Sequence, residues 1–195
     1  MKNSESIASA DALLIVDMQN DFLPGGSLAV SGSEQIIPVI NRYIEKFSVH
    51  GNPIYLTRDW HPPDHFSFKH QGGPWPVHCV ADSHGAEFSA SLSLPKKFEI
   101  VSTGFLRDRE GYSGFEETDL QTKLEQSGIT RLFVAGVATD YCVLNTVLEA
   151  LKLGFTVFLL QDAVRAVNVD PGDGDKALQA MRQQGAIMVT LDELS

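Results

Sequence analysis

The sequence predicts an α/β fold organised around a parallel β-sheet. Six short apolar runs recur along the 195 residues, and most are continuous rather than alternating, as expected for strands that are buried on both faces. Helical patterns lie between several of these runs. Such alternation of strands and helices is typical of a parallel sheet with right-handed crossover connections.

The predicted elements follow one another in a regular order. Strands are expected at residues 12–16, 53–57, 98–101, 132–137, 156–160 and 186–190. Helices are expected at 34–47, 117–126, 141–153 and from 173 or 174 to 183. The first helix has isoleucines at helical spacing, and the other three are followed by a glycine that can terminate them. The long segment 59–95 is irregular, and a loop of that length in a compact domain is usually functional.

Length and composition limit the class of protein. The chain is long enough for one domain, expected at 11–195 after an N-terminal tail at 1–10. It has 15 basic and 25 acidic residues, a net charge of −10, and no basic run, which argues against nucleic acid or an anionic membrane as partner. Two cysteines are too few for a disulfide scaffold. No apolar stretch approaches the ~18 residues of a membrane span. Both observations favour a cytoplasmic protein.

Cys142 lies where a predicted strand ends and a predicted helix begins. Thr139 or Asp140 can cap this helix, whose free N–H groups and positive dipole end would lower the pKa of the thiol. The position is also at the carboxyl edge of the sheet, where open α/β folds bind ligands. Cys142 is therefore a candidate nucleophile, although free cysteines are more often buried and inert.

Asp17 ends the first predicted strand and should lie at the same edge as Cys142. Burial would raise the pKa of this carboxyl group and suit it to accept a proton from a thiol. The alternative is a carboxylate that caps a helix or binds backbone N–H groups of a loop. Asp21, four residues further on, is expected to be structural.

A second group of polar residues follows the second predicted strand. Asp59 and His61 form a D-x-H pair whose side chains point the same way in an extended chain, and His65 and His78 follow. One carboxylate with two or three imidazoles suits zinc, iron or manganese. A histidine cluster on a solvated surface is the alternative.

Three aromatic residues, Phe22, Trp75 and Tyr112, lie in predicted loops rather than on the face of a helix or strand. They can enclose a flat ring, or they can simply pack against the rest of the protein.

Six segments together resemble the isochorismatase-like cysteine hydrolases and, within them, the nicotinamidase/pyrazinamidase family. They are DMQNDFLPGGSLAV (17–30), TRDWHPPDHFSF (57–68), GPWPVHCV (73–80), GYSGFEETDL (111–120), VAGVATDYCV (134–143) and DAVRAV (162–167). The resemblance extends from about residue 11 to the end of the chain. It implies a three-layer, Rossmann-type fold in which a six-stranded parallel sheet has helices on both faces.

The resemblance also implies an activity, the hydrolysis of nicotinamide to nicotinate and ammonia through a thioester. Cys142 would attack the amide carbon, and Asp17 would accept the thiol proton and deliver it to the leaving ammonia. The backbone N–H groups of Ala138 and Cys142 would form the oxyanion hole, with a cis peptide bond between Val137 and Ala138.

By the same resemblance, Asp59, His61 and His78 would bind a divalent metal, most readily zinc, with iron or manganese as alternatives. The metal would hold the pyridine nitrogen directly or through its water. His65 would be an additional ligand, or it would contact the ligands without binding the metal itself. Phe22, Trp75 and Tyr112 would form the aromatic wall around a small aromatic amide; a homo-oligomer is left open.

One position departs from the family pattern. The family has a catalytic lysine at the end of the third strand, and counting back from Tyr112 puts Thr103 there. Lys96 and Lys97 would lie ~20 Å away at the opposite end of the strand. Arg107 or Arg109 in the following loop could supply the missing charge.

This departure leaves several functions open: an amidase, a catalytically weak homologue that binds a pyridine-type ligand, or a hydrolase of another small amide or of isochorismate.

Overall fold

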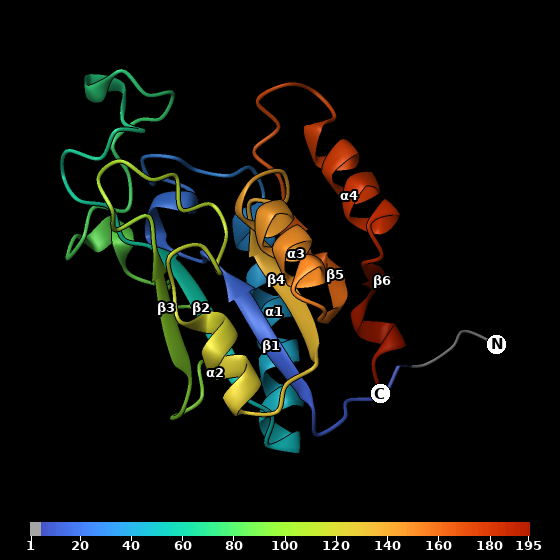
Figure 1. Ribbon diagram of the computed structural model, residues 1–195. Helices are drawn as coiled ribbons and strands as arrows, with labels where there is room; N and C mark the ends of the chain where they lie inside the picture. The colour runs from blue at the N-terminus through green and yellow to red at the C-terminus, as the bar shows by residue number, and fades with distance from the viewer. Residues whose placement is uncertain (1–4) are drawn as a thin grey trace.

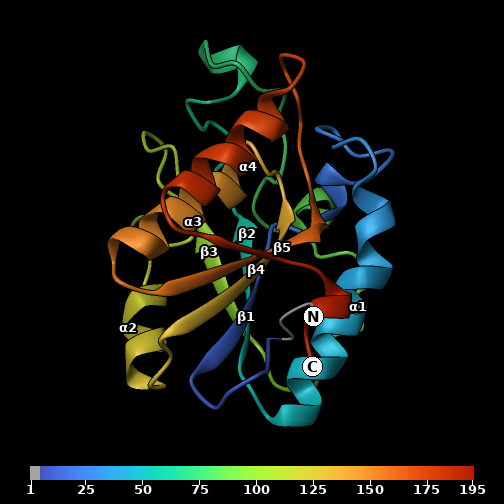
Figure 2. The ribbon, with the colours of Figure 1, turned by 90° about the vertical axis from the view of Figure 1, so that its right-hand side faces the viewer.

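The computed structural model describes residues 5–195 and has the three-layer α/β architecture that the sequence predicts (Figure 1). Helix α1 (Ser33–His50) covers one face of the sheet. Helices α2 (Leu120–Gln126), α3 (Cys142–Lys152) and α4 (Asp173–Gln183) cover the other, as the two views show (Figures 1 and 2).

The sheet contains six strands, all paired in parallel, among the described residues. They are β1 (Asp11–Val16), β2 (Ile54–Asp59), β3 (Glu99–Thr103), β4 (Arg131–Val137), β5 (Thr156–Arg165) and β6 (Ile187–Val189). Their order across the sheet is β3-β2-β1-β4-β5-β6.

The direction of winding reverses between β1 and β4, the two central strands. At such a switch point the connections leave in opposite directions and open a crevice at the carboxyl edge of the sheet. The two strands approach closely there: a Cβ on Gly136, whose φ is +114°, would lie 2.0 Å from the carbonyl oxygen of Val16. Glycine is therefore required at this point.

Burial on both faces explains why the predicted strands read as continuous apolar runs. In β1, Leu13 and Ile15 pack into the core beneath α1, whereas Leu14 and Val16 pack into the core beneath α3. Each side chain of the strand is almost completely buried. An alternating pattern would have left one of the two helical layers without an apolar partner.

Three local predictions were wrong. Helix α2 begins at Leu120 rather than at 117, because Glu117 has a positive φ of 56° and belongs to the preceding turn. No side chain caps α3; Asp140 instead accepts the N–H groups of Val167 and Asn168, at 2.9 and 2.7 Å. Strand β5 continues beyond 160 to Arg165, after a register shift in its pairing with β4.

The beginning of the described chain lies against its end. Glu5 donates its N–H to the carbonyl of Glu193 at 2.7 Å, and Arg131 binds both Glu5 and the buried Asp11. Residues 1–4 of the predicted tail lie outside the described residues, and the boundary at residue 11 stays a prediction. Within residues 5–195, every helix is too short or too polar to cross a membrane.

Candidate active site

The carboxyl ends of β1, β2, β3 and β4 bring together most of the polar residues singled out in the sequence. Asp17 directly follows β1, Asp59 and Thr103 are the last residues of β2 and β3, and Cys142 is the first residue of α3 after β4. The carboxylate oxygens of Asp17 and Asp59 and the sulfur of Cys142 lie within 4.8 Å of one another. Parallel strands end at one edge, which is why residues so far apart in sequence meet.

Asp17 is 2% exposed and accepts a hydrogen bond from the Thr57 hydroxyl at 2.6 Å. Burial, followed by the negative charge of Asp59, raises the pKa of the Asp17 carboxyl group to about 8. The direction agrees with the sequence-based expectation. A carboxyl group with this pKa can hold a proton near neutral pH and release it again.

The Cys142 thiol does not have the lowered pKa that its place at a helix N-terminus predicts. Burial raises its pKa well above the usual value, and the negative charges of Asp17 and Asp59 add to the effect. The backbone N–H of Ala138 opposes the shift but does not overcome it. The peptide bond between Val137 and Ala138 is cis, as the family resemblance implied.

Asp59, His61 and His78 form a buried cluster suited to a metal ion. Oxygen Oδ2 of Asp59 lies 3.3 Å from Nε2 of His61 and 3.7 Å from Nε2 of His78. The opposite ring nitrogens, Nδ1, lie 2.9 and 2.8 Å from the carbonyls of Gly104 and Pro76. If each Nδ1 donates to its carbonyl, each Nε2 has a free lone pair, which is the usual arrangement of metal-binding histidines. Two imidazoles and one carboxylate therefore fit a divalent metal that retains open coordination positions.

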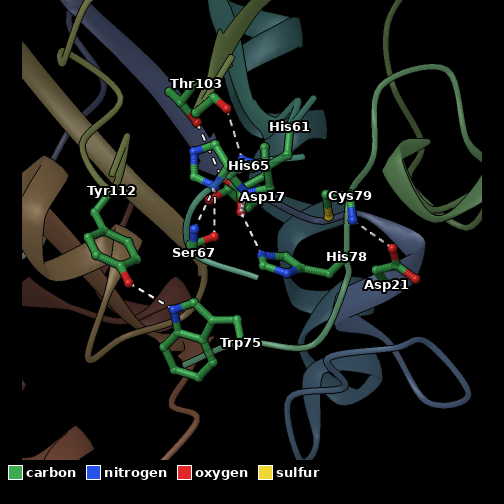
Figure 3. Close-up of polar contacts among 12 residues, drawn as sticks. Asp17, Asp21, His61, His65, Ser67, Trp75, His78, Cys79, Thr103 and Tyr112 are labelled. Carbon is green, nitrogen blue, oxygen red and sulfur yellow. Dashed lines mark hydrogen bonds and ion pairs between the residues drawn. The ribbon is translucent and has the colours of Figure 1, made fainter. Parts of the chain in front are cut away.

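Backbone pairing fixes the loop that carries His78. The N–H of His61 binds the carbonyl of Cys79 at 3.0 Å, and Ala81 binds the carbonyl of His61 at 2.8 Å. Asp21 accepts the N–H of Cys79 at 2.7 Å (Figure 3). Asp21 thus has the structural role expected of it, because it anchors the residue next to His78.

His65 lies beside the cluster rather than in it. Its Nδ1 is 2.7 Å from the Ser67 hydroxyl (Figure 3), and its Nε2 is 2.8 Å from the carbonyl of Arg109. The ring lies 4.3 Å from that of His61, centroid to centroid. With both nitrogens engaged, His65 is placed to support His61 from outside the metal cluster, the second of the two roles considered for it.

Next to the cysteine is a pocket with about 350 Å³ of space free of protein atoms. Trp75 and Tyr112 line it and are joined by a hydrogen bond of 2.8 Å from the indole N–H to the phenol oxygen (Figure 3). Phe22 lines it from the side of β1 and lies 5.8 Å from the His78 ring. The three predicted aromatic residues therefore line one cavity, whose apolar character is typical of a small-molecule site.

Several residues of this site are not among those that the sequence patterns predict. Tyr141 lines the pocket, and its ring lies 5.0 Å from that of Trp75; its position immediately before Cys142 could have indicated this. Leu28 and Val167 also line the pocket. Gln19, completely buried, binds the backbone N–H and carbonyl of Asp59, each at 2.8 Å. Nothing local in the sequence distinguishes this glutamine from an exposed one.

No lysine or arginine is among the described residues that line the pocket. Arg107 pairs with Asp64 at 3.0 Å and is 66% exposed. Arg109 lies 3.9 Å from Glu117 and is 59% exposed. Neither arginine takes the place of the family lysine in this structure. Thr103 does not line the pocket; its hydroxyl lies 3.3 Å from an oxygen of Asp59.

Fold and site together define a class of protein: an open parallel α/β enzyme with a buried cysteine–carboxylate pair beside a histidine–carboxylate cluster. Residues 11–193 match the isochorismatase domain. The nicotinamidase of Acinetobacter baylyi is 38% identical over an alignment 196 residues long, gaps included, and the match covers 89% of this chain and 89% of that protein.

Two solved structures are similar over nearly the whole chain. The zinc complex of the pyrazinamidase of Pyrococcus horikoshii has 48% sequence identity and a TM-score of 0.89, and the match covers 93% of this chain and 99% of that one. PnC1 from L. infantum in complex with nicotinate has 36% identity and a TM-score of 0.91, with 98% of both chains covered. The chain belongs to the isochorismatase family and, within it, to the nicotinamidase/pyrazinamidase group of amide hydrolases.

Proposed function

We propose that this protein hydrolyses nicotinamide, or a close aromatic amide, to the corresponding acid and ammonia through a thioester on Cys142. The observation that carries the proposal is that one aromatic pocket is lined both by Cys142, which has Asp17 beside it, and by Asp59 and His78 of the Asp59/His61/His78 cluster. Similarity to nicotinamidases, and to structures that contain zinc or nicotinate, supports the choice of substrate.

In the first half of the reaction, Asp17 as a carboxylate accepts the thiol proton while the sulfur of Cys142 forms a bond to the amide carbon. The N–H groups of Ala138 and Cys142 face the developing oxyanion. Cys142 begins α3, so its N–H belongs to the free donors of a helix N-terminus. Asp17 then gives the proton to the amide nitrogen, the C–N bond breaks, and ammonia leaves a thioester behind.

In the second half, water attacks the thioester carbon and Asp17 accepts a proton from this water. The C–S bond then breaks, the carboxylic acid leaves, and the proton returns to the sulfur. The raised pKa of Asp17, about 8, suits a group that must accept and release a proton twice in each cycle.

Asp59, His61 and His78 would hold the divalent metal, with zinc as the first choice because two imidazoles and one carboxylate are a common catalytic zinc set. When bound, the metal would supply a Lewis acid for the pyridine nitrogen, either directly or through its water. Trp75, Tyr112 and Phe22 would orient the ring so that its amide faces Cys142.

The test is ammonia release from nicotinamide by the zinc-loaded protein, with Cys142→Ala and Cys79→Ala compared. Cys79 is the matched control, because it is also buried but does not line the pocket. We expect Cys142→Ala to lose turnover and Cys79→Ala to keep it, and acylated wild-type protein to be trapped by rapid quenching and mass spectrometry. Turnover by Cys142→Ala would refute the cysteine mechanism.

One observation favours a second candidate, a protein that binds a pyridine-type ligand and turns it over weakly or not at all. The pocket lining within residues 5–195 contains no lysine or arginine, and the pKa of the thiol is well above its usual value. Titration calorimetry with nicotinamide separates the two: saturable binding without ammonia release supports the second candidate, and turnover above the Cys142→Ala background supports the first.

A further inference from the structure

We propose that Thr103 is a positioning residue for the metal centre: its hydroxyl holds the Asp59 carboxylate so that Oδ2 faces His61 and His78. This inference rests on the metal site of the proposed function. It assigns to Thr103 a role toward the metal ligands rather than toward the reacting thiol.

The sheet register brings the two residues together. Asp59 and Thr103 are the last residues of neighbouring parallel strands and are direct partners in the β2–β3 pairing. The Thr103 hydroxyl lies 3.3 Å from Oδ1 of Asp59 and 3.3 Å from the carbonyl of Arg58, so it can donate to either oxygen. Thr103 is only 2% exposed, and solvent competes little for this hydroxyl. A charged acceptor forms the stronger hydrogen bond.

The two oxygens of Asp59 have different surroundings. Oδ2 faces Nε2 of both histidines, whereas Thr103 is the one side chain that donates to Oδ1 within residues 5–195. Gln19 binds the backbone of Asp59 and leaves the carboxylate free to rotate. Without the Thr103 hydroxyl, Oδ1 would lose the one side-chain hydrogen bond described for it, and the polar side-chain contacts left to the carboxylate would be those of the two histidines that are to bind the metal. Outer partners of this kind orient metal ligands.

The neighbouring strand repeats the arrangement. Thr57 on β2 donates to Oδ1 of Asp17 at 2.6 Å, so the carboxylate after β1 is held by a threonine of β2, and the carboxylate that ends β2 by a threonine of β3. Thr57 is also buried, at 1% exposure. It therefore provides a matched control: the same change, a lost buried hydroxyl, at the proton-transfer carboxylate instead of at the metal ligand.

A direct role of Thr103 in the chemistry of Cys142 has less support. Thr103 does not line the pocket, and both hydrogen-bonding contacts of its hydroxyl are to residues of β2. A role toward the thiol would lower kcat even with the metal site fully loaded. A positioning role at Asp59 would change metal affinity and would be overcome by excess metal.

The experiment measures zinc affinity by competition with a chromophoric chelator, without substrate, for wild type, Thr103→Val, Thr103→Ser and Thr57→Val. Valine keeps the shape of threonine without its hydroxyl, and serine keeps the hydroxyl. We expect Thr103→Val to bind zinc roughly 10- to 100-fold more weakly. Thr103→Ser and Thr57→Val should keep a zinc affinity within about threefold of wild type. Serine keeps the hydroxyl, and Thr57 donates to Asp17 rather than to a proposed metal ligand.

Activity with zinc in large excess completes the test. Thr103→Val should then approach the wild-type kcat, whereas Thr57→Val should have a lower kcat at every zinc concentration. Wild-type zinc affinity in Thr103→Val, equal weakening by Thr57→Val, no rescue by serine, or absence of zinc binding in wild type would each overturn the inference. If zinc affinity follows the expected pattern but wild type releases no ammonia, the proposed function fails and the positioning role stands.

Discussion

Replacing Asp17 by asparagine should abolish amide hydrolysis and also stabilise the metal-free protein at alkaline pH. The pKa of Asp17 is raised from 3.8 to about 8, with burial as the main cause and the charge of Asp59 as the second. Between these two values the folded protein retains a proton that the unfolded chain has already released. Rising pH therefore favours the unfolded state.

The size of the effect follows from this difference in pKa. The stabilising contribution of protonated Asp17 is fully present below about pH 4 and is lost as the pH rises through about 8. Each pH unit inside this window lowers the free energy of unfolding by about 1.4 kcal/mol. From pH 5 to pH 8 the wild type should lose about 4 kcal/mol that the asparagine variant, which cannot ionise, does not lose.

The assay is urea unfolding of EDTA-treated wild type and Asp17→Asn at pH 5, 6.5 and 8. His61 and His65, whose pKa values are shifted in opposite directions, titrate in both proteins, so the difference between the proteins reports the ionisation of Asp17 together with its effect on His61, whose pKa the charge of Asp17 raises. Ammonia release by the zinc-loaded variant should fall at least about 100-fold. If the free energy of unfolding changed equally with pH in the two proteins, the reasoning would be refuted. Such a result would mean that Asp17 is already ionised in the folded protein at pH 5.

Three further predictions concern the pocket and its supports. Removal of metal with EDTA should abolish ammonia release, and added zinc should restore it; full activity in a preparation shown to be metal-free by elemental analysis would contradict the proposed metal role. Tyr112→Phe leaves the Trp75 indole N–H without its partner and should raise KM roughly 5- to 10-fold with little change in kcat, as expected for about 1 kcal/mol; an unchanged KM would count against the aromatic wall. Gln19→Leu removes the hydrogen bonds to the backbone of Asp59. Because these buried polar groups lose their partners, the free energy of unfolding should fall by about 3 kcal/mol. Urea unfolding that matches wild type would disprove this.

Several features of the fold could be predicted because they depend on local patterns. The apolar runs identified all six strands, since strands buried on both faces are rich in apolar residues over most of their length. The end of a helix could be predicted where glycine follows it, as at Gly128 and Gly154. The start of α3 was predicted to within one residue, but its cap was not, because Asp140 accepts N–H groups of the segment after β5 instead of capping the helix.

The chemistry of the site shows the same division. Burial of Asp17 could be inferred from the four apolar residues before it, and the direction of its pKa shift followed. The pKa of Cys142 could not be inferred, since it depends on two carboxylates that the sequence places 125 and 83 positions away.

By itself, then, the sequence determined the class of fold, the motifs of the family and the residues proposed to carry the chemistry. The tertiary structure decided which groups face one another: Thr103 toward Asp59, Tyr141 toward Trp75, and both arginines of the β3 loop toward solvent. The physical reason is the distance along the chain between the interacting residues. Strand and helix patterns reflect burial and hydrogen bonding within a few residues, whereas the orientation of a side chain and its pKa depend on atoms that only folding brings within a few ångströms.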